Sequence, residues 1–215
     1  MEQKQINLTA LEDMLEELAQ KNWAISKQVF SEDFCKDLAH ECQNLAAAGQ
    51  LSKASIGKGA SKTVRSEIRG DFIQWLDDSH PFHQCLELIR QSLNQFFFLG
   101  LRRVEAHFAL YPPGAGYAKH IDNHRPNSGQ NSGSSGGGSN HRKITFVLYL
   151  NENWQKDHGG ELSLYNPDKD SEMLGQVEPT MGTLILFRSD LFPHQVEKSS
   201  ANRMSLTGWF RDDAL

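Results

Sequence analysis

The chain has 215 residues, of which 38% are hydrophobic and 23% charged, and its formal net charge is −5. This length allows one domain with a sizeable core, and a negative charge without a dense Lys/Arg run argues against nucleic acid as a partner. The sequence has no apolar run long enough to cross a bilayer and no apolar signal-peptide core after Met1, so we expect a cytoplasmic protein without a membrane partner.

The first hundred residues are predicted to form mainly helical support. Thr9-Ala10-Leu11-Glu12 has the pattern of a capping box that opens a helix. A strand follows over 23–30, and then a second helix from a cap at Ser31 or Asp33 to about Ala48. A third helix is predicted over 81–98, with five side chains mostly facing inward: Leu86, Leu88, Ile89, Leu93 and Phe96.

The chain contains three cysteines, Cys35, Cys42 and Cys85. An odd and sparse set does not make a disulfide framework, which fits a reducing compartment. We expect them to behave as small buried hydrophobic residues.

Between the second and third helices lies a segment rich in Gly, Ser and Lys. Its two glycines, Gly57 and Gly59, are not followed by the Gly-Lys-Ser/Thr of a phosphate loop, so a mobile loop is the better interpretation. The following residues, 68–76, have strand character.

The second half of the chain is predicted to be mainly β. About seven short strands are expected, among them 103–111, 143–150, 161–165, 183–187, 195–198 and 203–210. Short strands separated by turns indicate a sandwich or jelly roll. The Gly/Ser-rich tract 127–140 has little to bury and is predicted to be a flexible insertion at the mouth of a site.

His120-Ile121-Asp122 is the candidate centre of that site. On extended backbone, residues two apart project to the same side, so both side chains can reach one ion. His194 would complete the two-histidine, one-carboxylate set that suits non-haem Fe(II). A His-x-Asp pattern also arises by chance, and three unrelated polar residues are the alternative.

Arg203 stands at the head of the last predicted strand, nine residues after His194. A guanidinium buried in a jelly roll needs an anion, because an unpaired buried charge is costly. A dicarboxylate cosubstrate would supply one with bidentate geometry, and an internal Asp or Glu would serve equally well.

These residues stand within a set of motifs that resembles the Fe(II)/2-oxoglutarate dioxygenases, and among them the prolyl hydroxylases of the oxygen-sensing type. The resemblance runs from about Arg65 to Phe210. It is carried by Ile68-Arg69-Gly70-Asp71-x-Ile73-x-Trp75, Tyr111-Pro112, Gly116-Tyr117-x-x-His120-x-Asp122-Asn123, Tyr149-Leu150-Asn151-x-x-Trp154, Gly159-Gly160-x-Leu162, Phe187-x-Ser189-Asp190, Pro193-His194-x-Val196 and Arg203-x-x-x-Thr207-x-Trp209. Gln195 departs from it, since an acidic residue often follows the second histidine.

The resemblance implies an α+β, mainly β fold: a double-stranded β-helix (a cupin-like jelly roll) braced by N-terminal helices. It implies one dioxygenase domain over 1–215, with helical support and a mobile substrate loop (about 51–76) in 1–100 and the jelly-roll core in 101–215. We expect a monomer.

By position in these motifs, His120, Asp122 and His194 would bind Fe(II). Five residues would bind or wall 2-oxoglutarate: Arg203 and Tyr149 at the far carboxylate, Thr207 beside them, Tyr111 towards the near end, and Trp209 as a wall. Packing in the core is the alternative for each aromatic residue. Ascorbate is a further candidate cofactor beside O₂.

In the family the loop over 51–76 closes on the protein substrate. Arg69, Asp71, Trp75 and Arg142 would then belong to the substrate-loop region, with an Asp71–Arg142 ion pair anchoring the loop. Two solvated side chains are the alternative, since exposed pairs contribute only about 0–1 kcal/mol.

The implied reaction is hydroxylation of a prolyl residue at C4, coupled to conversion of 2-oxoglutarate and O₂ to succinate and CO₂. The partner would be a protein with a target proline, and elongation factor Tu is the leading candidate if the chain is bacterial. Three alternatives stay open: an oxygenase of another substrate class, a non-enzymatic metal-binding jelly-roll sensor, and an interaction module.

Overall fold

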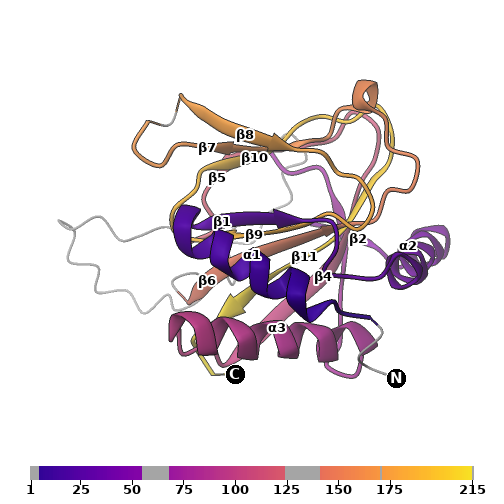
Figure 1. The fold of residues 1–215 in the computed structure, drawn as a ribbon. Coiled ribbons are helices and arrows are strands. Elements are labelled where there is room, and N and C mark those ends of the chain that lie inside the picture. Colours follow the sequence, from indigo (N-terminus) through magenta and orange to yellow (C-terminus); the bar gives the residue numbers. More distant parts are fainter. Residues whose placement is uncertain (1–4, 55–67, 124–140, 170, 215) are drawn as a thin grey trace, which may run out of the picture.

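Two antiparallel sheets form the body of the protein (Figure 1). The computed structural model describes residues 5–54, 68–123, 141–169 and 171–214. The larger sheet has the strand order β1-β9-β6-β11-β4-β3-β2, and the smaller one β5-β10-β7-β8. Figure 1 shows the smaller sheet over one face of the larger, with α1 and α3 beneath the other face. This arrangement confirms the predicted jelly roll with helical support.

Three helices precede most of the strands. They are α1 (Leu8–Lys21), α2 (Glu32–Ala47) and α3 (Pro81–Phe97). Ser31 caps α2 as predicted, by accepting a hydrogen bond from Phe34 N. The predicted start of α1 is wrong, because Asn7 provides the cap through its bond from Ala10 N. An Asn side chain serves this position as well as Ser or Thr does.

The strands of the larger sheet are β1 (Trp23–Ser26), β2 (Ser52–Lys53), β3 (Phe72–Trp75), β4 (Arg103–Tyr111), β6 (Arg142–Tyr149), β9 (Leu184–Arg188) and β11 (Arg203–Arg211). Those of the smaller sheet are β5 (Tyr117–His120), β7 (Leu162–Tyr165), β8 (Met173–Val177) and β10 (His194–Val196). The predicted strand over 23–30 is shorter in the structure. Strand β8 was not predicted, because its exposed Met173 and Leu174 break the alternation of a half-buried strand.

Both faces of the larger sheet are buried, and the strand alternation divides its residues between two hydrophobic clusters. On β6, Phe146 and Leu148 pack towards the helices, whereas Val147 and Tyr149 pack towards the smaller sheet. The second cluster therefore fills the space between the sheets, where the candidate site lies.

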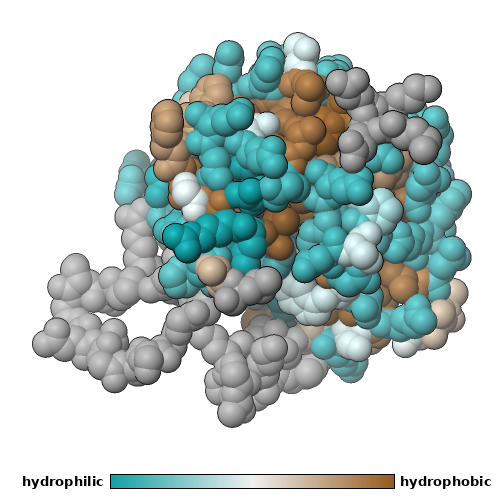
Figure 2. All heavy atoms as spheres, turned by 90° about the horizontal axis from the view of Figure 1, so that it is seen from below, coloured by the Kyte–Doolittle hydropathy of each residue, from teal (hydrophilic) through white to brown (hydrophobic). Residues whose placement is uncertain are grey.

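The inner sides of the helices match the prediction in part. Leu86, Ile89 and Leu93 are buried, as are all three cysteines, none of which forms a disulfide within the described residues. The prediction that Leu88 and Phe96 face inward is wrong, since their side chains are 36% and 44% exposed. The face seen from below, where Figure 1 places α3, is mostly hydrophilic with hydrophobic residues between (Figure 2).

Among the described residues, no helix is long and apolar enough to cross a bilayer. Residues 55–67, half of the predicted loop at 51–76, and the whole insertion 127–140 lie outside the described residues.

Gly208 tests the packing of the central strand β11. A Cβ atom there would lie 2.0 Å from the carbonyl oxygen of Glu105 and 2.7 Å from the Phe146 ring. We expect Gly208→Ala to lower the free energy of unfolding by about 3 kcal/mol, because neither backbone nor ring can move away freely. Urea unfolding followed by circular dichroism measures this.

Gly175→Ala is the matched control, because a Cβ atom at this position on the edge strand β8 meets nothing within 4 Å. Equal stability of the two variants would contradict this account of the sheet.

Candidate active site

The register of the smaller sheet brings the two candidate ligand histidines together. Strands β5 and β10 pair antiparallel with His120 directly opposite His194, and Asp122 follows two residues after the end of β5. Nε2 of His120 lies 3.6 Å from Oδ1 of Asp122, and Nε2 of His194 lies 3.6 Å from its Oδ2. The three residues can therefore gather around a single ion.

Backbone carbonyls fix the orientation of both imidazoles. Nδ1 of His120 lies 2.9 Å from the carbonyl oxygen of Ala118, and Nδ1 of His194 lies 3.0 Å from that of Phe192. A carbonyl only accepts, so Nδ1 is the protonated nitrogen in each ring. The Nε2 lone pairs are left for a metal, the arrangement that outer partners give to metal-binding histidines.

Two hydroxyl groups support Asp122, one directly and the other through the first. Thr145 Oγ1 donates to Oδ2 of Asp122 at 2.8 Å and lies 2.8 Å from Ser189 Oγ. Burial raises the pKa of Asp122, but His194 and His120 outweigh burial and keep the pKa well below its usual range. The carboxylate is thus ionised at neutral pH, as a metal ligand must be.

This donor set fits Fe(II). Two imidazoles and one carboxylate on one side leave other coordination positions open, as in non-haem iron oxygenases. A second group in the described residues, His141 with Asp212 and Asp213, suits a metal less well. Its carboxylates are already paired with Lys143, Arg211 and Arg103.

Arg203 is a buried cation whose charge is unpaired within the described part of the chain. It is 2% exposed, and its Nε donates to the carbonyl oxygen of Gly160 at 2.7 Å. No Asp or Glu of the described residues pairs with it, so the predicted alternative of an internal acid is not found there. Its guanidinium faces the rings of Tyr111 and Tyr149 at 5.1 and 5.0 Å.

The hydroxyl of Tyr149 is also buried beside Arg203, and within the described ranges it makes no hydrogen bond of normal geometry. A buried cation next to an unpartnered hydroxyl fits a carboxylate group, which would accept from both.

One pocket contains both the His-Asp-His group and Arg203. It is lined by most of the predicted site residues, namely Arg69, Asp71, Tyr111, Arg142, Thr207 and Trp209. Tyr149 packs behind Arg203, and Trp75 lies at the rim against the ring of His107. The structure thus brings together residues from both sheets.

The predicted Asp71–Arg142 ion pair is wrong. Buried Asp71 instead accepts two hydrogen bonds from Arg69, at 2.7 and 2.8 Å. Arg142 donates to Glu105 at 2.9 Å and stacks on Trp209 at 3.5 Å. The cause is strand order: β4 and β6 flank β11, so Glu105 and Arg142 meet across it, whereas Asp71 precedes β3 on the other side of β4.

Four residues near the site were missed in the sequence. Thr145 holds Asp122, Tyr117 stacks on His120 with ring centroids 3.6 Å apart, and Glu105 pairs with Arg142. The fourth, His107, lines the pocket. Alternation along β4 was a usable signal, because Glu105 and His107 share the face of the predicted Tyr111.

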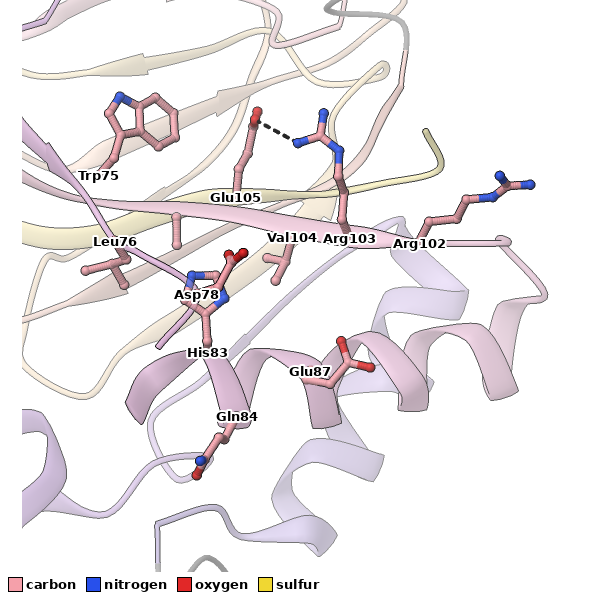
Figure 3. Close-up of a pocket in the computed structure, with 11 residues that line it drawn as sticks. Trp75, Leu76, Asp78, His83, Gln84, Glu87, Arg102, Arg103, Val104 and Glu105 are labelled. Atoms are coloured by element: carbon pink, nitrogen blue, oxygen red, sulfur yellow. Dashed lines mark ion pairs between the residues drawn. The ribbon is translucent and has the colours of Figure 1, made fainter. Parts of the chain in front are cut away.

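A second, more open pocket adjoins the site at its rim, between α3 and β4 (Figure 3). Trp75, Glu105 and Arg103 lie on one side of β4, and Val104 and His83 on the side of α3. The Arg103–Glu105 ion pair is part of its wall.

Known proteins share this fold and these motifs. A family model described as the 2OG-Fe(II) oxygenase superfamily matches residues 106–211. The crystal structure of a Pseudomonas putida prolyl-4-hydroxylase is 36% identical, covers 94% of this chain and 98% of its own, and superposes with a TM-score of 0.78. The chain belongs to the 2OG-Fe(II) oxygenase superfamily.

Other relatives of this oxygenase are prolyl hydroxylases. Human prolyl hydroxylase EGLN3 is 28% identical over 200 residues, which are 85% of this chain and 77% of that protein. A Trichoplax adhaerens prolyl hydroxylase in complex with a hypoxia inducible factor peptide fragment is 25% identical, with a TM-score of 0.77, covering 94% of this chain and 89% of its own.

The oxygenase is therefore an Fe(II)/2-oxoglutarate-dependent dioxygenase of the prolyl hydroxylase type, and its cofactors are Fe(II), 2-oxoglutarate and O₂. The donor set and the unpaired buried arginine described above fit this chemistry.

Thr145→Val removes the hydroxyl that orients Asp122 while keeping the size of the side chain. We expect Fe(II) to bind about 10- to 100-fold more weakly, the usual effect of losing an outer partner of a metal ligand. Equilibrium competition with a coloured chelator under anaerobic conditions measures the affinity.

Thr180→Val is the control, because its hydroxyl bonds to Thr183 away from the pocket. Unchanged Fe(II) affinity in Thr145→Val would show that Asp122 needs no support from β6.

Proposed function

We propose that this oxygenase hydroxylates C4 of a prolyl residue in a protein substrate, with conversion of 2-oxoglutarate to succinate and CO₂. The observation that carries the proposal is the single pocket shared by the His-Asp-His group and Arg203, whose charge has no acid partner among the described residues. Similarity to prolyl hydroxylases, including a bacterial prolyl-4-hydroxylase, supports the prolyl target and the position of attack.

In this proposal His120, Asp122 and His194 hold the iron. Their backbone and hydroxyl partners hold the ligand atoms before the metal arrives, which lowers the entropy cost of binding. With Fe(II) and 2-oxoglutarate bound, these residues would support oxidative chemistry in which one oxygen atom of O₂ enters the prolyl product and the other enters succinate.

Arg203 binds the far carboxylate of 2-oxoglutarate, and Tyr149 donates its hydroxyl to the same group. Thr207 and Tyr111 line the path from Arg203 towards the metal group, and Trp209 forms the wall. Burial strengthens these charge-assisted bonds, because the surrounding dielectric is low. The aromatic walls also keep water from the reacting centre.

The substrate side of the pocket is formed by Arg69, Asp71, Trp75 and Arg142. The Arg69–Asp71 pair holds the start of β3, and Arg142 on Trp209 holds the opposite wall. We propose elongation factor Tu as the substrate, because the chain is 36% identical to the Pseudomonas putida enzyme and 28% identical to human EGLN3. We also propose that the protein is a cytoplasmic monomer with one domain.

The direct test is incubation of the iron-loaded protein with 2-oxoglutarate, O₂ and a panel of purified proteins that includes elongation factor Tu. We expect succinate release that depends on the substrate and one added oxygen on a prolyl residue, located by tandem mass spectrometry. Absence of any hydroxylated proline across the panel would overturn the proposal.

Arg203→Ala should separate cosubstrate binding from metal binding. We expect the dissociation constant of 2-oxoglutarate to rise about 100-fold, because the charge-assisted bonds to one carboxylate are lost, with Fe(II) affinity nearly unchanged. His120→Ala should instead weaken Fe(II) binding and abolish turnover. Equilibrium dialysis with labelled 2-oxoglutarate and with Fe(II) measures both.

Arg102→Ala is the matched control, since this exposed arginine lies outside the pocket. Normal 2-oxoglutarate affinity in Arg203→Ala would contradict the role of the buried guanidinium.

A further inference from the structure

His107 is a fully buried histidine with both ring nitrogens unpartnered in the part of the chain that the structure describes. It lies on β4, opposite Thr207 of β11 on one side and Trp75 of β3 on the other. Its ring lines the pocket that contains the metal ligands and Arg203. Burying a polar group without a hydrogen bond is unfavourable, so two such atoms in a pocket point to a ligand.

The imidazole of His107 is neutral in this setting. Burial lowers its pKa to about 3, and the nearby Arg69 adds to the effect. A neutral imidazole offers one N–H donor and one acceptor nitrogen. It can therefore bind a neutral polar group without placing another charge beside the arginines.

Two tryptophans flank this imidazole. The ring centroids of Trp75 and Trp209 lie 4.7 and 5.6 Å from that of His107, and 6.4 Å from each other. Figure 3 shows Trp75 on the same side of β4 as Glu105. The indole N–H of Trp209 is a second buried donor without a partner in the described residues. An apolar wall with two unused N–H donors is thus built around His107.

The place of His107 along the sheet separates it from the far-carboxylate end. Arg203 pairs with Tyr111, four residues along β4 from His107, which is about 13 Å of extended strand. Asp122 is held from β6 by Thr145, two strands away from β4. His107 therefore lies across the pocket from the metal ligands, on the side of Trp75, which is 47% exposed at the rim.

A prolyl residue within a chain has a polar surface of matching chemistry. Because it has no backbone N–H, the polar backbone atoms around it are all acceptors, namely its own carbonyl oxygen and that of the preceding residue. Its pyrrolidine ring is apolar and packs well against aromatic faces. Donors in an aromatic wall suit such a residue, whereas an N–H-bearing residue would leave its own donor to be satisfied.

We propose that His107 is a substrate-binding residue that donates a hydrogen bond to a carbonyl beside the target proline, with the Trp209 indole as the second donor and both tryptophans against the pyrrolidine ring. The proposal rests on the proposed prolyl target of the site. Trp75 covers the imidazole, so it must turn aside when the peptide enters.

The test compares His107→Phe, which keeps the ring and removes both nitrogens, with His107→Gln, which keeps an N–H donor. The probe is a set of short synthetic peptides with a fixed central proline and varied neighbours. Hydroxylation is followed by mass spectrometry, and binding by anaerobic affinity selection in the presence of Fe(II) and 2-oxoglutarate. His83→Phe is the control, because His83 Nε2 also has no partner among the described residues but lies outside the active-site pocket.

We expect His107→Phe to raise the peptide KM about 10-fold, with unchanged affinity for Fe(II) and 2-oxoglutarate. His107→Gln should recover most of the loss, and His83→Phe should match the wild type. The unfolding temperature of His107→Phe should equal or exceed that of the wild type, because two unsatisfied polar atoms are removed. A purely structural role would lower it.

An unchanged peptide KM in His107→Phe, or a loss confined to 2-oxoglutarate affinity, would overturn this proposal alone. A wild-type protein that neither binds nor hydroxylates any of the peptides would overturn it together with the prolyl target of the proposed function.

Discussion

The antiparallel pairing of β5 with β10 is the constraint on which the rest of the site depends. It sets His120 opposite His194, and it points both Nε2 atoms at Asp122. A shift of one residue in this register would send one imidazole to the other face of the sheet. The backbone carbonyls of Ala118 and Phe192 then hold the rings, so that strand geometry and ring orientation support each other.

The larger sheet supplies the site residues that the smaller sheet does not contain. Thr145 reaches Asp122 from β6, and Arg203 enters the same pocket from β11. Because both faces of this sheet are buried, its inward side chains are held by packing in both hydrophobic clusters. The same packing leaves several buried polar groups without a hydrogen-bond partner in the described part of the chain, among them the Tyr149 hydroxyl, His107 and the Trp209 indole. They gather around one pocket, which is where a ligand would satisfy them.

The arginines around the pocket differ in their partners, and this difference separates structural from binding roles. Arg69 pairs with Asp71, and Arg142 pairs with Glu105, a carboxylate that Arg211 and Arg103 also contact. Among the described residues, Arg203 contacts a backbone carbonyl and two tyrosine rings but no carboxylate. Paired arginines shape the walls at little cost in charge, whereas the unpaired one keeps its charge for an anion.

The sequence by itself determined the ligand chemistry and the class of fold. The alternating strands of the second half favoured a sandwich or jelly roll, His-x-Asp with the distant Pro-His offered an iron-type donor set, and the resemblance of the surrounding motifs selected the jelly roll and the iron site. It could not decide which acid pairs with which arginine. The Asp71–Arg142 prediction failed because partners across a sheet depend on strand order, and Glu105 is 37 residues from Arg142 in the chain.

Tertiary structure alone decided whether the side chains of His107 and Arg203 find polar or charged partners. A histidine on a predicted strand carries no sign of whether its nitrogens find partners, and an arginine carries none of whether an acid lies beside it. Both depend on long-range contacts between β4, β11 and β6, which bury these side chains in one pocket. Local sequence fixes what each group can donate or accept, and only the packed sheets decide which groups remain unpaired.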